Sequence, residues 1–489
     1  MNSAQMNCLH ITRLTTVRYL RRTGFIPSSS HLPFSLLDCT VWRPFSVGTT
    51  RGFVEHNSCL RVMRDAHPTS ARHPVAYIHP FNVKSSFSVL ARQNQLSPAL
   101  AVRARQIAMT GLCHSPRYSV APMMEVTDRH FRTLSRLISR DAVLYTEMVV
   151  DRTLIYNEQL REYALRIPPL PNSSSSQHPV VLQLGGSVPD ELEAAARIAA
   201  KYGYSEVNLN CGCPSPKVAG KGCFGAALMR APEVVAEATK KMAAVLPETT
   251  PVTVKCRIGV DDLDSYDFLR NFVEIVHQRG GVKHFIIHAR KAILGGLSPA
   301  QNRSVPPLKY GYVHRLLQDF PDVTFTINGG FKTLSAVQEQ LDVGVHGVMV
   351  GREVMDKPWH ALCDVDRLFF GRNCTPDDGT ILTRRGVLRD YTAYAENEIE
   401  RTGCSIRAVV KPLLQLFHGE PNGKIYRRAI DECLRDPALS VGDIINRASS
   451  VLSDDVLDAP PPSAVAHLDK SVADDVQVCA AFEHRQEGL

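Results

Sequence analysis

Polar side chains stand in several short apolar runs of the sequence, where a buried strand would ordinarily carry only hydrophobic residues. Gln183, Lys255 and His288 each lie within such a run or end it. Burying groups of this kind costs several kcal/mol unless each one finds a hydrogen-bond or charge partner. A single Lys or His in a strand is more often structural than functional. Several together indicate a site whose ligand supplies the missing partners.

Two glycine-containing segments indicate where a phosphate group would bind. The Gly-Gly pair at 329–330 and the Gly-Arg pair at 351–352 each follow one of the apolar runs. In barrels of alternating strands and helices, backbone N–H groups after the last two strands commonly hold a phosphate. With Lys255 and His288, these segments predict flavin mononucleotide (FMN), whose anionic reduced ring a nearby Lys would favour. A phosphate-binding barrel lyase without a flavin is the alternative.

Cys213 lies between Gly212 and Pro214, in a segment typical of an exposed loop after the fourth apolar run. A thiol there can reach a ligand that lies across the strand ends. The alternative is that Cys213 packs as a small buried hydrophobic residue, as a free Cys usually does. Cys211 has no role that we can argue, and Cys223 is expected to pack. The 13 cysteines form no Cys-x-x-Cys pair, so neither a metal site nor a thioredoxin-type site is predicted.

The elements that must position these residues follow from an alternation of patterns that begins at residue 118. Eight short runs, most of them rich in β-branched residues, lie at 118–122, 143–147, 180–185, 206–210, 252–257, 284–288, 324–328 and 347–351. Amphipathic stretches lie at 127–139, 189–202, 232–245, 264–279, 309–319, 333–341 and 358–369. Strands that alternate with helices form a parallel sheet with helices on its outer faces, and eight such units predict a (β/α)₈ TIM barrel over 115–372. A doubly wound open sheet is the alternative, although no Gly-x-Gly-x-x-Gly segment follows the first run.

The barrel is expected to be followed by a small all-helical domain over 380–452, because 390–399 and 409–418 are both helix-patterned. The tail over 453–489 has three consecutive prolines at 460–462 and many acids, so it is expected to be disordered. With 44% hydrophobic and 21% charged residues, the composition excludes a collagen, a coiled-coil rod and a wholly disordered protein. No stretch approaches the roughly 18 consecutive apolar residues of a membrane helix.

The positive charge of the chain is concentrated in its first part. Residues 1–100 contain ten Arg and one Lys against three acids, a net charge of +8, whereas the whole chain of 489 residues carries +7. The net positive charge of the chain is therefore no evidence that the protein binds nucleic acid. A leader over 1–110 that is rich in Arg and Ser and poor in acids predicts a disordered transit peptide for a plastid or a mitochondrion. A basic tail without an address, and hence a cytoplasmic protein, is the alternative.

Motifs in a constant order give about residues 115–430 a resemblance to a known family. They lie at 121–128, 145–148, 208–215, 225–230, 254–259, 287–291, 327–330 and 350–352. In these segments the sequence resembles the tRNA-dihydrouridine synthases. The segment 296–308, with Gly-Leu-Ser-Pro at 296–299 and Asn302-Arg303, resembles the A-type branch, which acts on the D-loop uridines 20 and 20a.

The resemblance implies a TIM barrel that carries FMN, followed by a helical domain that recognises tRNA. The FMN contacts that it implies are Pro122, Met123, Met124, Gln183, Lys255, His288, Asn328, Gly329, Gly330, Gly351 and Arg352. The tRNA contacts that it implies are Asn210, Arg303, Lys424 and Arg427. NADPH or NADH would be the reductant, and a monomer without a membrane is expected. Two departures stand out: Ala300 replaces a Lys common in this branch, which could alter tRNA docking, and Cys211 replaces another small residue.

The reaction that the resemblance implies reduces uridine to 5,6-dihydrouridine. NADPH reduces the flavin, hydride passes to C6 of the uracil ring, and the Cys213 thiol protonates C5. A thiol with an ordinary pKa of about 8.5 is mostly protonated at neutral pH, as a general acid must be. The target base must first leave its stack to reach the flavin.

Other functions fit parts of the same pattern. Another FMN barrel enzyme, such as a dihydroorotate dehydrogenase or an ene-reductase, would share the flavin residues but would not need a basic helical domain. A tRNA-binding protein without turnover would not need Lys255, His288 and Cys213 together. The basic cluster of the helical domain, Lys411, Lys424, Arg427 and Arg428, could also be an ordinary solvated helix face.

Overall fold

The structure is a computed structural model that describes residues 117–170, 177–215, 224–371 and 381–462. The predicted leader at 1–110 and most of the predicted tail lie outside the described residues, as does Cys223. No helix in the described ranges has the length and apolar character needed to cross a membrane.

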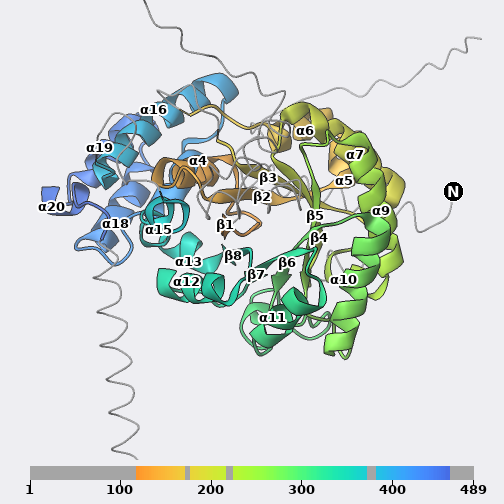
Figure 1. Cartoon of the computed structure of the whole chain (residues 1–489). Helices are drawn as coiled ribbons and strands as arrows, with labels where there is room; N and C mark the ends of the chain where they lie inside the picture. The colour runs from red at the N-terminus through yellow and green to blue at the C-terminus, as the bar shows by residue number, and fades with distance from the viewer. Residues whose placement is uncertain (1–116, 171–176, 216–223, 372–380, 463–489) are drawn as a thin grey trace, which may run out of the picture. The chain divides into compact units, whose positions relative to one another are not determined.

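Eight parallel strands close into a barrel in the order β1 to β8, with β1 paired to both β2 and β8 (Figure 1). They are β1 (Tyr118–Val120), β2 (Val143–Val150), β3 (Val180–Gly185), β4 (Glu206–Cys211), β5 (Val252–Arg257), β6 (His284–His288), β7 (Thr324–Asn328) and β8 (Gly347–Val350). The closed order confirms the TIM barrel and excludes the open sheet. All eight predicted runs are strands.

Helices cover the outside of the barrel. They are α4 (Arg129–Ile138), α5 (Asp151–Tyr156), α6 (Glu158–Leu165), α7 (Pro189–Ala199), α9 (Pro232–Val245), α10 (Tyr266–Gly280), α11 (Tyr310–Asp319), α12 (Leu334–Val343), α13 (Arg352–Asp356), α14 (Pro358–Leu362) and α15 (Val365–Phe370). Several begin at a side chain that accepts a hydrogen bond from the first turn, as Asp128 does from Phe131 N at 2.8 Å and Ser265 from Phe268 N at 3.1 Å. The sequence patterns missed α5 and α6, which have 6 and 8 residues, because so few turns give little periodicity.

The two faces of each strand separate the hydrophobic core from the site. On β4, Val207, Leu209 and Cys211 are buried in the layer between the sheet and the helices. Because side chains alternate along a strand, Asn208 and Asn210 point to the inside of the barrel. Cys211 therefore belongs to the outer core, which agrees with its having no predicted role.

A helical region follows the barrel, as predicted. It consists of α16 (Arg384–Thr402), α17 (Ile406–Val410), the 3₁₀ turn η5 (Lys411–Gln415), α18 (Gly423–Cys433), α19 (Val441–Ser449) and α20 (Asp454–Leu457). The region continues past the predicted boundary at 452, because Val456 and Leu457 of α20 are buried and Arg385 pairs with Asp458 at 2.7 Å. The acidic composition of 453–489 predicted disorder, but Asp454 and Asp458 at its start bind Arg385 of α16.

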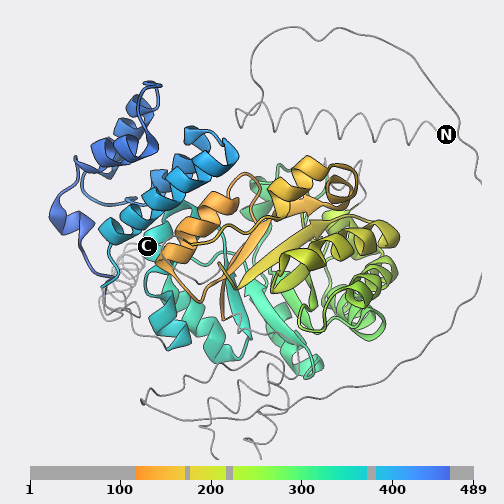
Figure 2. The same ribbon diagram turned by 90° about the horizontal axis from the view of Figure 1, so that it is seen from above.

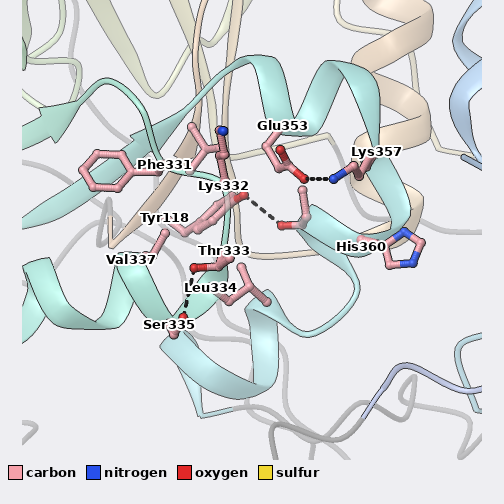
Figure 3. Close-up of a pocket in the computed structure, with 12 residues that line it drawn as sticks. Tyr118, Phe331, Lys332, Thr333, Leu334, Ser335, Val337, Glu353, Lys357 and His360 are labelled. Atoms are coloured by element: carbon pink, nitrogen blue, oxygen red, sulfur yellow. Dashed lines mark hydrogen bonds and ion pairs between the residues drawn. The ribbon is translucent and has the colours of Figure 1, made fainter. Parts of the chain in front are cut away.

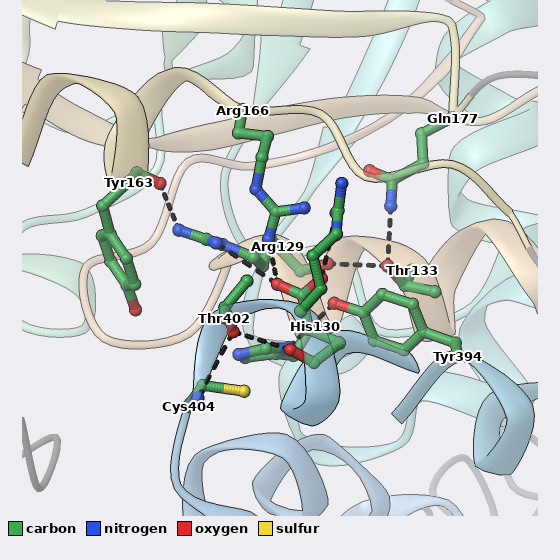
Figure 4. A network of polar contacts seen from close by, with 11 residues as sticks. Arg129, His130, Thr133, Tyr163, Arg166, Gln177, Tyr394, Thr402 and Cys404 are labelled. Atoms are coloured by element: carbon green, nitrogen blue, oxygen red, sulfur yellow. Dashed lines mark hydrogen bonds and ion pairs between the residues drawn. The ribbon is translucent and has the colours of Figure 1, made fainter. Parts of the chain in front are cut away.

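Buried polar contacts join α16 to α4 of the barrel (Figure 4). The carboxylate of Glu398, on α16, accepts from Arg129 at 3.3 Å, from Arg401 at 3.2 Å and from Arg166. Glu398 is 1% exposed. This group of charges, called here the joint, places the helical region beside α4, as the turned view also shows (Figure 2).

Candidate active site

The strand register brings the predicted site residues together at the carboxyl ends of the strands. Gln183 pairs with Asn208, and Asn210 pairs with Lys255 on the next strand. His288 at the end of β6 pairs with Asn328 at the end of β7. This end of the barrel, called here the mouth, is where TIM-barrel enzymes carry out their chemistry.

Lys255 has a neutral partner in the mouth. Its Nζ donates to Asn328 Oδ1 at 3.2 Å, and Asn328 Nδ2 donates in turn to the Met349 carbonyl at 2.7 Å. Removal from water, followed by the nearby Arg257, lowers the pKa of Lys255 to about 8. An anionic ligand group beside Nζ would relieve this penalty, so Lys255 suits a negatively charged ligand.

His288 is buried among positive charges. Burial, and then Arg257 and Lys255, lower the pKa of the imidazole well below its ordinary value. The ring is therefore neutral at pH 7. A neutral ring can hydrogen-bond to a ligand without adding to the positive charge of the mouth.

The glycine pair after β7 lets the backbone approach neighbouring side chains of the mouth closely. Gly329 and Gly330 have φ of 123° and 85°, which favour glycine. A Cβ at Gly329 would lie 2.6 Å from His288 Cδ2, and one at Gly330 would lie 2.7 Å from Leu308 Cδ1. Only residues without a Cβ fit at these two positions, which brings the backbone of the predicted phosphate segment against His288 and Leu308.

Guanidinium groups around the mouth bond to backbone carbonyls. Arg257 donates to the Gly212 and Asn302 carbonyls at 3.0 and 2.8 Å, and Arg352 donates to the Arg303 carbonyl at 3.0 Å. Among the described residues, all the hydrogen bonds given for these two guanidinium groups go to backbone carbonyls, and no ion pair includes either of them. The mouth therefore keeps an excess of positive charge, which favours an anionic ligand.

Cys213 lies half-buried at the mouth, in the loop after β4. Its N–H donates to Asn210 Oδ1 at 3.0 Å, and its carbonyl accepts from Ala226 N at 2.9 Å. Burial raises the pKa of the Cys213 thiol, an effect that Arg257 and Lys255 partly oppose. The thiol is therefore protonated at neutral pH, as a proton donor must be.

The remaining predicted residues lie around the mouth or away from it. Pro122, Met123 and Met124 follow β1, and Met124 is 55% exposed. Arg303 is exposed on the loop between β6 and α11, whereas Lys424 and Arg427 lie on α18 of the helical region. A tRNA-binding surface that included all of these residues would therefore extend from the barrel to the helical region.

Sequence reasoning did not single out Arg257 or Asn208. Arg257 stands two residues after Lys255, so the alternation of side chains along β5 places both on the inner side. Asn208 stands two residues before Asn210 by the same rule. This spacing was the signal that could have found them.

The structure also contains a cavity of about 190 Å³ outside the barrel, between β1, β8 and α12 to α14 (Figure 3). None of the predicted flavin or tRNA residues lines it. Several of its polar groups pair with one another, among them Lys357 with Glu353 at 2.9 Å and the Tyr118 hydroxyl with the Ala361 carbonyl at 2.8 Å. In the described ranges, no three His, Cys, Asp or Glu side chains are grouped so as to hold a metal ion.

Comparisons with known proteins agree with this geometry. The family model described as dihydrouridine synthase (Dus) matches residues 119–440. The chain belongs to the dihydrouridine synthase family. Members of this family are flavin-dependent oxidoreductases, and the matched residues include both the mouth and α18.

Curated relatives share much of the chain with it. The tRNA-dihydrouridine(20/20a) synthase of Vibrio vulnificus is 41% identical over 331 residues, which are 68% of this chain and 95% of the relative. The proteins of that name from Shigella flexneri and Escherichia coli K12 are each 44% identical over 318 residues, 65% of this chain and 88% and 86% of the relatives.

Proposed function

We propose that this protein reduces uridines 20 and 20a in the D-loop of tRNA to 5,6-dihydrouridine, with FMN as cofactor and NADPH as reductant. Membership of the dihydrouridine synthase family and the names of its relatives support the substrate and the reaction. The observation that carries the proposal is the meeting of a half-buried Lys, a neutral His and a protonated thiol at one barrel mouth.

The residues of the mouth fit a flavin nucleotide. The Gly329 and Gly330 backbone, with Gly351 and Arg352, would hold the phosphate, while Lys255, Gln183 and His288 would contact the ring. Pro122, Met123, Met124 and Asn328 would complete the contacts. The chemistry that a bound flavin supplies is hydride transfer from NADPH to C6 of the uracil ring.

Cys213 would give the proton that C5 needs. The high pKa of its thiol keeps the proton on sulfur until hydride transfer makes C5 basic. Lys255 would hold positive charge beside the ring, since at pH 7 a pKa of about 8 leaves its ammonium mostly charged. Arg303 would bind the RNA at the mouth, and Lys424 and Arg427 would bind phosphates further along the tRNA.

Cys213→Ala tests this assignment. The variant should retain FMN and be reduced by NADPH at near the normal rate. Oxidation of its reduced flavin by tRNA should slow by roughly 10²–10⁴-fold, the usual worth of a positioned proton donor. Cys211→Ala is the matched control, because Cys211 lies in the outer core. Equal loss in both variants would refute the assignment of Cys213.

The leader supports a second proposal, that residues 1–110 carry an organelle address. The matched family region begins only at residue 119. A chain that starts near Gly111 should fold as a monomer, bind FMN and reduce tRNA in vitro. The leader fused to a fluorescent protein should enter mitochondria or plastids, whereas a diffuse cytosolic signal would refute the address.

A further inference from the structure

Strand β2 carries a bulge close to its carboxyl end. Tyr145 pairs with Val181 and Met148 pairs with Gln183, so β2 has one residue more than β3 between these two pairs. Thr146 stabilises the bulge, because its hydroxyl accepts from the Gln183 N–H at 3.0 Å. Bulges are frequent next to active sites, where they direct a side chain to a place that regular alternation would not reach.

Glu147 is the other residue of the bulge, and its carboxylate reaches the loop after β1 (residues 122–127), called here the β1 loop. Its Oε1 accepts from the Glu125 N–H at 2.5 Å. Glu147 is half-buried, and removal from water, followed by the like charge of Asp128, raises its pKa to about 7. The carboxylate therefore occupies this place at a cost, which the hydrogen bond from Glu125 partly offsets.

Glu125 has a backbone conformation that is unfavourable for any residue other than Gly. Its φ is 61°, in the left-handed region. Two contacts hold it there: Glu147 accepts from its N–H, and Lys411 of the 3₁₀ turn η5 donates to its carbonyl. The barrel and the helical region thus each hold one side of this residue.

The β1 loop also carries the proposed flavin contacts Met123 and Met124. Bonds within the loop fix the first of them, since the Met123 carbonyl accepts from the Thr127 N–H at 2.9 Å and the Met123 N–H donates to Thr127 Oγ1 at 3.0 Å. These bonds do not include the peptide group between Met124 and Glu125, whose N–H donates to Glu147. A change in the conformation of Glu125 would therefore move Met124.

We propose that Glu147 is a positioning residue for the flavin: its carboxylate, directed by the bulge of β2, holds Glu125 in the left-handed conformation and so places Met124 against the ring. Lys411 holds the other side of Glu125 and thereby connects the helical region to the β1 loop. This inference rests on the proposed function, in which Met123 and Met124 contact FMN.

Glu147→Ala tests the inference through the binding of FMN to flavin-free protein without tRNA. The β1 loop of this variant should relax, so that FMN must restore the left-handed residue, and the dissociation constant should rise roughly tenfold. Asp443→Ala is the matched control, because the Asp443 carboxylate also accepts from a backbone N–H, that of Ser440 at 3.1 Å, but at the start of α19. It should leave FMN binding unchanged.

Substitutions at Glu125 distinguish positioning from a general loss of stability. Gly adopts a positive φ without a penalty, so Glu147→Ala combined with Glu125→Gly should bind FMN within about threefold of the wild type. Glu147→Ala combined with Glu125→Ala should stay weak, because Ala keeps the penalty while it removes the same side chain. A merely structural role of Glu147 would not be rescued by Gly at this position.

Two further variants extend the test. Glu147→Gln keeps an oxygen for the Glu125 N–H, so it should weaken FMN binding less than Glu147→Ala, and it serves where the Ala variant folds poorly. Lys411→Met should weaken FMN binding by about two- to threefold, because Lys411 is exposed. Its effect should be smaller when Glu147 is already Ala, since both side chains hold the same residue.

Unchanged FMN affinity in both Glu147 variants would overturn the inference. An equal loss of affinity in the two double variants at Glu125 would overturn it as well, because the left-handed conformation would then have no part in the effect. Failure of the proposed function looks different, because it appears in the wild type, whose reduced flavin would not be oxidised by tRNA.

Discussion

The joint and the mouth both hold positively charged side chains away from water, but these charges have different partners in the two regions. At the joint, Arg129 and Arg166 meet the buried carboxylate of Glu398. At the mouth, Lys255 and Arg257 meet only neutral oxygens in the contacts described above. A charge paired inside the protein contributes to the fold, whereas one with a neutral partner is available to an anionic ligand.

Removing one charge from each region should lower the stability in one case and not in the other. Glu398→Gln leaves buried arginines without a counter-charge and should lower the free energy of unfolding by about 3–5 kcal/mol. Lys255→Met removes a charge that has no counter-charge, so flavin-free protein should be as stable as the wild type or more so, although it should no longer hold FMN. Denaturant unfolding of both variants measures this difference.

Glu400→Gln is the control for the joint, because Glu400 is exposed on the same helix. It should change the free energy of unfolding by less than about 0.5 kcal/mol. If Lys255→Met destabilised the flavin-free protein as strongly as Glu398→Gln, the proposed difference between the two regions would be wrong.

The way in which the stability of the flavin-free protein depends on pH tests the same comparison. The pKa of Lys255 is about 8 in the folded protein and 10.5 as its ordinary value, so between these values the unfolded chain binds more protons. Stability should therefore rise with pH across this window, by at most about 3 kcal/mol, relative to Lys255→Met. FMN affinity should fall as pH rises through about 8, since the anion then loses its positive partner. Parallel pH curves for the two proteins would contradict the account.

The sequence predicted the mouth better than the joint. Its residues lie at the ends of strands, and short β-branched runs placed all eight strands, so the topology brought Gln183, Lys255 and His288 together. Glu398 and Arg129 are 269 positions apart, and no local pattern shows that they meet. The sequence also did not predict that Asn210 Oδ1 accepts hydrogen bonds from Gly212 N–H and Cys213 N–H, for a related reason. The motif gives the residue, but only the backbone of the loop shows which groups its oxygen faces.

The smallest expected effect concerns the basic side chains of the helical region. Replacing Lys424 and Arg427 by Ala should weaken tRNA binding and reduce its salt slope by about two units, one for each lost phosphate contact. Reduction of the flavin by NADPH should not change. Arg447→Ala, on the exposed side of α19, is the control. An unchanged salt slope in the double variant would place the tRNA surface elsewhere.

The most direct measurement of the central claim is a single turnover without oxygen. Protein reduced with a limited amount of NADPH is mixed with tRNA that lacks dihydrouridine, the flavin absorbance is followed, and the tRNA is then mapped. The account predicts that the flavin is reoxidised as one dihydrouridine forms per flavin, at position 20 or 20a. Flavin that stays reduced, or dihydrouridine at other positions only, would contradict it.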